Sequence, residues 1–514
     1  MNRVPSASGG GPEPNPGTWL SEAVAGTSVA LVLLPQSLAY AELAGLPAWR
    51  GLLAAGIPPI VASFSASSPW LQTGPTAITA LLCYGALAPL APPGSLEHAS
   101  LAAILALMVG VIRLLLGRLR AGMLAALLSQ AVLAGFTLAA ALLIVGSQIP
   151  ALLGVSPPEG DTLARAVAAV ADPGRWHSES MLAAAVVAAL ILLGARLHRL
   201  LPGVLVAVGL AAWLAPVLGY QGATLGEIPS AVPALRLELP WRRLPELILP
   251  ALVLAVAGFA EAAAIAQRFA EVERRRWDPD RELLAQGAAN VASGLVGGMP
   301  VGGSFARSAL GHVAGGRTRA TGAVAGVLLL VALPWAGLLS SLPRAVLAAI
   351  VVVAARGLLD VRPMARLVSL SRPQAAIAMW TFAATLALAP RVELGLLAGM
   401  AVAVCVHLWR EMDVHIDVQR TDEKVVVRPL GVLWFGSVPR FRQRLADVLA
   451  DHKDIHRVEV DLSGLGRLDL SGALMLREML DGLRSDGVAV CLLHTPPQLV
   501  RVVGRVAGDL DHRP

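Results

Sequence analysis

The feature that most constrains this chain is a succession of apolar stretches through residues 19–411. A helix needs about 20 apolar residues to cross the roughly 30 Å hydrocarbon core of a bilayer, and most of these stretches approach that length. Only 15% of the 514 residues are charged, well below the roughly 25% of a soluble domain. The chain is therefore predicted to be an α-helical membrane protein.

Proline, glycine and arginine divide these stretches into fourteen candidate membrane helices. If the N-terminus is cytoplasmic, the connections on its side, which include Arg113, carry about twice as many arginines as the outer ones, which include Arg50. Cytoplasmic loops accumulate positive charge, so both termini are predicted to be cytoplasmic. Residues 1–18 are rich in proline, glycine and serine and are predicted to form a disordered tail. The candidate helices begin near residues 20, 51, 74, 99, 121, 180, 201, 247, 282, 303, 320, 342, 372 and 392.

The pattern changes near residue 412, where alternating apolar and polar residues indicate strands, followed by a strand, a loop, a helix and a strand. Residues 412–514 are therefore predicted to form a small soluble α/β domain. Both lysines of the chain, Lys424 and Lys453, lie here, and neither stands in the Gly-Lys-Ser/Thr context of a P-loop. Zinc-ligand spacings, a nucleophile elbow and a dinucleotide fingerprint are also absent from the sequence. We expect no enzyme, no cofactor and no metal site, so an ion gradient would have to drive any uphill transport.

Two of the candidate helices are too short to cross a bilayer. The third, in "LQTGPTAITALLCYGALAPLAPP", can run only from about Thr76 to Leu90, and the tenth, in "GGMPVGGSFARSAL", from about Gly303 to Val313. Each follows an irregular stretch of glycine and proline, as half-helices that start near the membrane midplane do.

The two short helices occupy corresponding positions in the two halves of the chain. Pro75 and Gly303 are separated by about the same number of residues as the first and the eighth candidate helix. This predicts two inverted repeats of seven helices, at about residues 19–220 and 240–411. The half-helices would then approach each other with their partly positive N-termini, so the sequence predicts an anion site between them.

Arg307 stands one turn into the tenth segment, in apolar surroundings. A charged side chain at the membrane centre costs about 2.5–3.5 kcal/mol on insertion scales, so it needs a partner. One interpretation is that its guanidinium lines the anion site, with a fork suited to carboxylate or sulfate. The other is an internal salt bridge to an acid such as Glu261, and both can hold together.

Several stretches of the chain resemble the sulfate permease (SulP) family of anion transporters. They are "AGTSVALVLLPQSLAYAELAGLPAWRGLLAAGIPP", "TGPTA", "GFAEAAAIAQRFA" and "GGMPVGGSFARSAL". The C-terminal domain resembles the STAS domain of that family and bacterial anti-sigma-factor antagonists. The resemblance implies a core and a gate domain in the inner membrane of a bacterium, an anion held between helices three and ten, and a homodimer.

Carried over position by position, the resemblance also implies which residues contact the anion. Helix one contributes two, and the starts of helices three and ten contribute the others. Glu261 matches a glutamate that is common in helix eight of the family. The implied substrate-binding residues are Gln36, Tyr40, Thr73, Gly74, Pro75, Thr76, Ala77, Ser304, Phe305, Ala306 and Arg307.

A proton carrier is expected because importing a dianion against about 100 mV costs roughly 2 × 2.3 kcal/mol, and each accompanying proton cancels about 2.3 kcal/mol. Glu42, where many relatives have an apolar residue, is one candidate, since a carboxyl group in a low-dielectric cavity can hold a proton near neutral pH. Alternatively, Glu42 is solvated at the outer mouth of helix one. Glu261 is the competing candidate.

The favoured function is proton-coupled symport of a small anion. A dicarboxylate such as fumarate is preferred, because an arginine fork and two helix ends suit a planar dicarboxylate. The alternatives are a sulfate or bicarbonate transporter or anion exchanger, a nucleobase permease, and a membrane-tethered regulatory STAS protein. The expected partners are the anion, protons, membrane lipids and a second copy of the chain, with no nucleic acid.

In the soluble domain, "DLSGLGRLDLSG" places Asp469 and Ser471 at the start of a predicted helix. In related bacterial regulators a serine at this position is phosphorylated, and a phosphate at a helix N-terminus is electrostatically favoured. The alternative is that Ser471 only caps the helix while Asp469 supports the turn.

Overall fold

The computed structural model describes residues 16–123, 128–156, 160–197, 203–226, 228, 239–421, 424–450, 456–506 and 511–513. The chain divides into two compact units, Met1–Met400 and Ala401–Pro514, and the division falls within helix α16 (Val392–Glu411). The predicted disordered tail lies outside the described residues as far as residue 15. Helix α1 begins at Pro16, within the predicted tail of residues 1–18.

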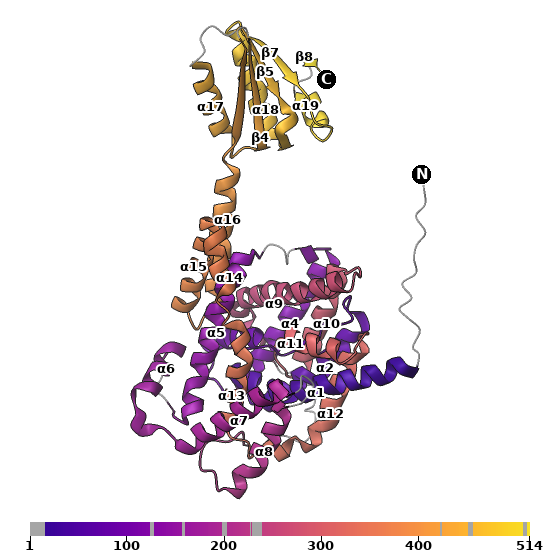
Figure 1. Ribbon diagram of the computed structural model, residues 1–514, viewed down its shortest axis with the longest axis vertical. Coiled ribbons are helices and arrows are strands. Elements are labelled where there is room, and N and C mark those ends of the chain that lie inside the picture. Colours follow the sequence, from indigo (N-terminus) through magenta and orange to yellow (C-terminus); the bar gives the residue numbers. More distant parts are fainter. Residues whose placement is uncertain are drawn as a thin grey trace. The chain divides into compact units, whose positions relative to one another are not determined.

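All fourteen predicted membrane helices have a counterpart among the described residues of the first unit and the start of the second (Figure 1). The fifth begins at Gln130, capped by Ser129, and not near residue 121 as predicted. Two additional short helices, α6 (Thr162–Ala171) and α14 (Arg362–Leu370), lie between them. The fourteen are α1 (Pro16–Leu43), α2 (Trp49–Ser65), α3 (Ala77–Leu87), α4 (Leu96–Arg118), α5 (Gln130–Leu153), α7 (Ser178–Leu197), α8 (Gly203–Val217), α9 (Leu244–Val272), α10 (Pro279–Leu295), α11 (Phe305–Val313), α12 (Ala320–Ala332), α13 (Arg344–Ala355), α15 (Arg372–Ala387) and α16.

Six stretches of helix in the described residues are long and apolar enough to span a bilayer unaided. They belong to α1, α4, α5, α9, α12 with the turn after it, and α16. The others are shorter or more polar, and α3 and α11 are the shortest members of the fourteen. Helices of this length reach only part of the way through the hydrocarbon core.

The two halves of the sequence are interleaved in the first unit. Helices α1, α2 and α4 pack against α10 and α12, with α3 and α11 among them, whereas α5 and α7 pack against α13 and α15. Gly326 allows one of the close crossings, since a Cβ there would lie 2.3 Å from the carbonyl oxygen of Gly56. The interleaving places the start of α3 and the start of α11 within one helical group.

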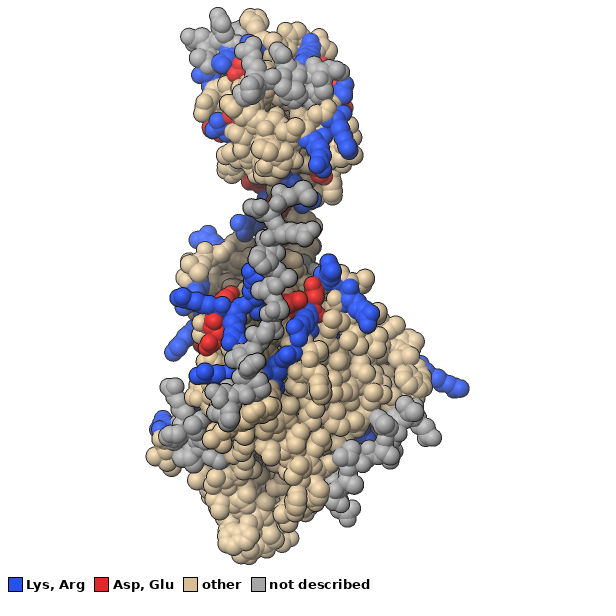
Figure 2. Space-filling view, turned by 90° about the vertical axis from the view of Figure 1, so that its right-hand side faces the viewer, with Lys and Arg blue, Asp and Glu red and all other residues tan. Residues whose placement is uncertain are grey.

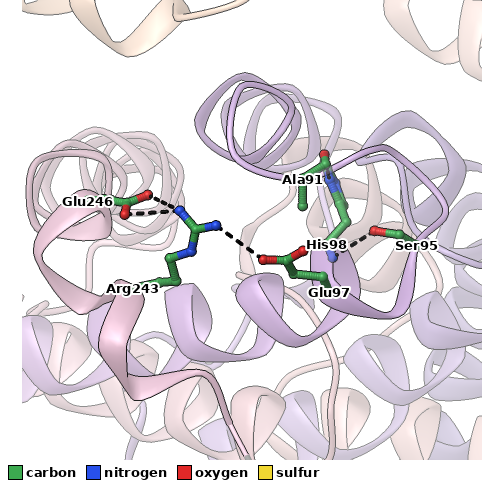
Figure 3. A network of polar contacts seen from close by, with 6 residues as sticks. All are labelled: Ala91, Ser95, Glu97, His98, Arg243 and Glu246. Carbon is green, nitrogen blue, oxygen red and sulfur yellow. Dashed lines mark hydrogen bonds and ion pairs between the residues drawn. The ribbon is translucent and has the colours of Figure 1, made fainter.

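A polar network at one end of that group fastens four helices together (Figure 3). His98, fully buried in α4, contacts the carbonyl oxygen of Ala91 after α3 at 3.1 Å and that of Ala44 after α1 at 2.9 Å. Arg243, just before α9, donates to Glu246 at 3.1 Å and reaches Glu97 at 3.4 Å. The end of half-helix α3 is therefore anchored to α1 and α4.

The second unit contains a mostly parallel sheet with helices against it, as the sequence predicts. The strand order is β3-β4-β5-β7-β8, with β6 also paired to β4; β3 and β4 are antiparallel and the other pairs are parallel. Alternate strand residues and the inner faces of the helices form one apolar core. The elements are β3 (His415–Thr421), β4 (Lys424–Leu433), α17 (Val438–Ala450), β5 (Arg457–Asp461), β6 (Leu465–Leu468), α18 (Leu470–Ser485), β7 (Ala489–Leu493), α19 (Val500–Val506) and β8 (Asp511–Arg513).

Candidate functional site

The site is built around two short strands that come from opposite halves of the sequence. β1 (Thr73–Gly74) pairs antiparallel with β2 (Gly302–Gly303), and Thr73 lies opposite Gly303. Glycine at 303 permits a close approach to α9, because a Cβ there would lie 3.0 Å from the Cα of Ala262. The predicted meeting of two broken segments is thus observed as a direct backbone pairing.

β1 leads into α3, whose N-terminus carries a capping box. The Oγ1 of Thr76 accepts a hydrogen bond from the Thr79 N–H at 3.2 Å, and the Oγ1 of Thr79 accepts one in return from the Thr76 N–H at 3.1 Å. Each hydroxyl satisfies a backbone donor that a helix start otherwise leaves free. α3 ends at Leu87, three residues before the predicted Leu90.

β2 leads into α11, whose cap is weaker. Ser304 Oγ accepts from the Arg307 N–H at 3.5 Å, at the limit of hydrogen bonding. The Ser304 N–H donates to the carbonyl oxygen of Gln72 at 3.0 Å, and Ser308 Oγ accepts from the Gln72 N–H at 2.9 Å. These two bonds fix the segment before β1 to the start of α11, so the partly positive ends of both half-helices meet at the strand pair.

Arg307 is the least satisfied polar group of this site. Its side chain is 1% exposed, and Nη1 donates to Gln36 Oε1 of α1 at 3.4 Å. Among the described residues, Nε and Nη2 have no hydrogen-bond partner. Nη2 lies against β1, because a Cβ at Gly74 would be only 3.3 Å away. The buried cation therefore has N–H groups left for a ligand, and leaving buried donors unpaired otherwise costs about 1–3 kcal/mol or more.

Two further titratable groups face Arg307. Tyr40, one turn after Gln36 on α1, is 7% exposed, and Glu261 on α9 is partly buried. Both groups lie within electrostatic range of Arg307. Within the described part of the chain, however, Glu261 makes neither an ion pair nor a hydrogen bond with Arg307, so the interpretation of Arg307 as a plain salt bridge to Glu261 is not what the structure contains.

Other residues implied by the resemblance lie on two different sides of the site. Thr73, Pro75, Thr76 and Ala77 are buried at the start of α3. Phe305 and Ala306 are exposed, and Phe305 stacks on Phe269 of α9 with ring centroids 6.2 Å apart. The structure thus brings together Gln36, Tyr40, Gly74, Ser304 and Arg307, while Phe305 turns toward α9.

Glu42 lies apart from this group. It lines a cavity of about 550 Å³ together with Arg344, and its Oε1 is 3.4 Å from the Nε of Arg344 at the start of α13. The Glu42 side chain is 23% exposed. Glu42 thus lies in a cavity and is mostly buried rather than simply solvated, and it has a cationic partner that the sequence did not reveal.

A row of polar residues on α10, which was not predicted from the sequence, forms hydrogen bonds with β1 and with Val301 just before β2. Asn290 Oδ1 accepts from the Val301 N–H at 2.9 Å and its Nδ2 donates to the Val301 carbonyl at 3.0 Å. Gln286 Nε2 donates to Thr73 Oγ1 at 2.8 Å. With Glu282, these residues are spaced by four, so they share one helix face, and this spacing in an apolar segment is the signal that could have found them.

Arg113 corrects a prediction. It was expected in a cytoplasmic connection, but it is fully buried in α4. Its Nη1 donates to the Val301 carbonyl at 3.1 Å, Nη2 to that of Leu254 at 3.0 Å and Nε to that of Ala255 at 3.1 Å. Arg50, expected in an outer loop, is also buried and donates to the Gly297 carbonyl at 2.7 Å. One arginine is thereby removed from each side of the charge count, and the bias between the two sides remains.

In the second unit the helix cap differs from the prediction. Asp469 is the N-cap of α18, and its Oδ1 accepts from the Gly472 N–H at 2.6 Å. Ser471 is exposed in the first turn and is not the capping residue. Among the described residues, no cluster of three or more His, Cys, Asp or Glu could hold a metal ion.

The comparisons with known proteins identify the family of the chain. Residues 20–381 match the sulfate permease family, and residues 415–508 match the STAS domain. The chain is 34% identical to a probable sulfate transporter of Mycobacterium tuberculosis, over 89% of this chain and 88% of that protein. It is 28% identical to a sodium-independent sulfate anion transporter of Bos taurus, over 96% of this chain and 86% of that protein.

Two solved structures share the fold. A structure of SLC26A9 matches with a TM-score of 0.88 at 20% identity, covering 96% of this chain and 87% of that chain. The transmembrane domain of the cyanobacterial bicarbonate transporter BicA matches with a TM-score of 0.63 at 24% identity, covering 75% of this chain and 97% of that one. At these identities the likeness establishes the fold alone, and it confirms the predicted helical membrane domain followed by an α/β domain.

Fold and site together define a class: a multi-pass anion transporter with two half-helices that meet at their N-termini, and not an enzyme. Within that class, the chain belongs to the sulfate permease family and carries the STAS domain of that family.

Proposed function

We propose that this protein is a secondary active transporter that imports sulfate together with protons. The observation that carries the proposal is the buried Arg307 guanidinium, which has unpaired N–H groups beside the starts of α3 and α11. Curated relatives along most of the chain are named as sulfate transporters. The initial preference for a dicarboxylate such as fumarate has no support among them, and sulfate takes its place.

The chemistry of the site suits a tetrahedral dianion. Arg307 supplies a full positive charge and a fork of donors, and two helix N-termini add partial positive charge and free backbone N–H groups. Gln36 holds one side of the guanidinium, and Gly74 leaves room for Nη2 beside β1. We expect Gln36, Tyr40, Ser304 and the first residues of α3 and α11 to complete the anion contacts.

Glu261 is the proposed proton carrier, and Glu42 is not. Glu261 lies close enough to Arg307 for their charges to interact, yet it makes no direct bond to Arg307. A negative Glu261 opposes the entry of an anion, so protonating it strengthens the field of Arg307 as sulfate binds. Glu42 already has Arg344 as a partner. Against about 100 mV, each proton offsets about 2.3 kcal/mol of the cost of importing the dianion.

The orientation and assembly are part of the same proposal. The arginines gather in one band of the first unit, whereas much of its remaining surface in that view is uncharged (Figure 2). We infer from this bias that both termini are cytoplasmic in a bacterial inner membrane. From the family resemblance we also propose that the transporter is a homodimer. Accessibility of an engineered cysteine at residue 3, labelled from outside intact cells, tests the orientation, and crosslinking in membranes tests the dimer.

The direct test is uptake of radiolabelled sulfate into proteoliposomes, with and without an imposed inward proton gradient. Wild type is compared with Glu261→Gln and with Glu42→Gln as the matched carboxylate control. We expect gradient-driven uptake in wild type and Glu42→Gln, and loss of the response to the gradient in Glu261→Gln. Unlabelled bicarbonate, fumarate and uracil are added as competitors.

Each outcome separates one part of the proposal. Loss of the gradient response in Glu42→Gln alone would assign the proton to the mouth of helix one. Uptake stimulated by sulfate trapped inside, but indifferent to protons, would identify an anion exchanger. If unlabelled bicarbonate or fumarate competed more strongly than unlabelled sulfate, that anion would be the preferred substrate in place of sulfate.

A further inference from the structure

A second cavity, which does not include Arg307, is lined by arginine. Its volume is about 290 Å³, and its walls come from the connection between α2 and β1, the connection between α9 and α10, and the connection between α11 and α12. No Asp or Glu is among its lining residues, all of which are described. The five arginines of this cavity are Arg275, Arg276, Arg281, Arg317 and Arg319.

Three of these guanidinium groups are positioned by neutral partners. Arg281 Nε donates to the Ser65 carbonyl at 2.9 Å, and Arg319 Nη1 donates to the Ala66 carbonyl at 3.1 Å. Arg275 lies over the Trp70 ring, 5.6 Å from its centroid. Within the described part of the chain, none of the five forms an ion pair. The positive charge of the cavity is therefore not neutralised by ion pairs among the described residues.

The carboxylates nearby are occupied by backbone amides. Glu282, fully buried, accepts from the Ser68 N–H at 2.7 Å and the Ser67 N–H at 3.0 Å. Glu22, also buried, accepts from the N–H groups of Arg317 and Thr318, each at 2.8 Å. These two acids shape the loops that present the arginines, and they leave the cavity itself electropositive.

We propose that this cavity binds a phosphate-bearing ligand. Arginine forks match the oxygens of phosphate, and five of them exceed what one small monovalent anion requires. Trp70 and Trp277 line the same cavity, and tryptophan is typical of the level of lipid headgroups. Basic pockets between helices on the cytoplasmic side recognise such headgroups. A phospholipid headgroup and a soluble polyphosphate share this chemistry.

An occupant would act on transport because the walls of the cavity continue into the transport site. Residues 66–70 lead directly into β1, and residues 317–319 follow shortly after the end of α11. A ligand that bridges Arg276 and Arg317 ties the segment before one half-helix to the segment after the other. The cavity is a regulatory site, and its occupancy is independent of whether Arg307 binds sulfate.

The test uses the full chain in nanodiscs of phosphatidylcholine, with the thermal unfolding midpoint and direct binding as readouts. The probes are inorganic pyrophosphate at constant ionic strength and, separately, nanodiscs in which part of the lipid is phosphatidylglycerol. The double variant Arg276→Gln/Arg317→Gln removes two cavity charges that anchor no loop. Arg356→Gln/Arg366→Gln, two exposed arginines elsewhere in the same unit, is the matched control.

We expect pyrophosphate to raise the midpoint of wild type and control, and to bind the cavity variant about tenfold or more weakly, as the loss of charge-assisted hydrogen bonds predicts. A response to phosphatidylglycerol alone, absent in the cavity variant, would support the proposal with a lipid as the source. Arg307→Gln should keep either response, which separates this site from the transport site. Equal responses of both double variants, or no response of wild type to either probe, would overturn the proposal.

Discussion

Arg113 and Arg307 are both fully buried arginines of the membrane unit, yet their surroundings are opposite. Arg113 is 0% exposed, and each of its three nitrogens donates to a backbone carbonyl. Arg307 is 1% exposed, and two of its three nitrogens have no partner. The two guanidinium groups flank the same strand pair, since Arg113 holds Val301 before β2 and Arg307 lies against Gly74 in β1.

The difference shows that burial alone does not distinguish a structural arginine from a binding one, whereas the number of its hydrogen bonds does. A buried polar group with all its hydrogen bonds made stabilises one arrangement of the chain. A buried polar group without them destabilises the fold by about 1–3 kcal/mol, and is retained where a ligand supplies the missing bonds. Arg113 is therefore part of the scaffold, whereas we propose that Arg307 is part of the binding site.

The largest effect on stability is expected for Arg113→Leu. The substitution removes three charge-assisted hydrogen bonds worth about 1.5–3 kcal/mol each, so we expect a loss of at least about 3 kcal/mol. The thermal unfolding midpoint in detergent measures it. Arg118→Leu, exposed at the end of the same helix, is the control and should change little. Equal losses in the two variants would show that Arg113 is not part of the scaffold.

Arg307→Gln should separate function from stability. Two or more bonds to the anion are lost, about 2–3 kcal/mol, so we expect sulfate uptake at low concentration to fall about 30- to 150-fold. The unfolding midpoint should stay the same or rise, because unpaired buried donors are removed. Arg268→Gln, which removes an arginine over the Phe305 ring, is the control. A fall of the midpoint like that of Arg113→Leu would place Arg307 in the scaffold as well.

Arg428 in the second unit provides a third case, a half-exposed arginine paired with a buried carboxylate. Its Nη2 lies 2.6 Å from Asp461 Oδ2, and the Ser463 N–H donates to Asp461 Oδ1 at 2.9 Å. Burial alone raises the pKa of Asp461, but the hydrogen bonds from Ser463 and Arg428 outweigh it and lower the pKa below its usual range. The stabilisation is therefore present above the unfolded pKa of about 3.9, and is lost as pH falls through the folded pKa.

Arg428→Gln should weaken the second unit by about 1–2 kcal/mol at pH 7, less than Arg113→Leu weakens the first, because Arg428 is partly solvated. The difference from wild type should shrink as pH falls from the unfolded pKa of about 3.9 through the lower folded pKa, where the folded Asp461 becomes protonated. Hydrogen exchange of peptides that cover Arg457–Asp461 in the full chain, corrected for intrinsic rates, measures both. A difference that persists unchanged at low pH would mean that Arg428 acts through packing and not through the charge of Asp461.

The sequence predicted the features that the membrane itself imposes. Apolar stretches divided at proline, glycine and arginine predicted the number of helices. The glycine-proline stretches before Thr76 and Ser304 revealed the half-helices, because non-helical backbone at membrane depth is tolerated only in a protein interior. The sequence could not reveal that Arg113 is buried, because a count of arginines along the chain does not show which side of a helix each one faces. The pairing of Glu42 with Arg344 was also hidden, because the two residues meet only in the folded chain.

The smallest effects, and the finest test of the comparison, concern the two helix caps. Thr76 and Thr79 satisfy each other's backbone N–H, whereas the Ser304 hydroxyl is only 3.5 Å from its donor. Thr76→Ala should therefore cost about 1 kcal/mol of stability and leave the KM for sulfate nearly unchanged. Ser304→Ala should cost less stability but raise the KM for sulfate several-fold, because a weakly engaged hydroxyl remains free to contact the anion.

Unfolding midpoints and uptake kinetics of the two variants, measured side by side, decide between a scaffold and a binding role for each hydroxyl. If Thr76→Ala raised the KM and Ser304→Ala did not, the anion would lie nearer the start of α3 than the start of α11. That result would also weaken the assignment of Arg307, because its guanidinium enters the site from the first turn of α11. If the expected pattern is found, the hydroxyl at the weakly capped start of α11 contacts the anion, whereas the hydroxyl at the capped start of α3 stabilises the fold.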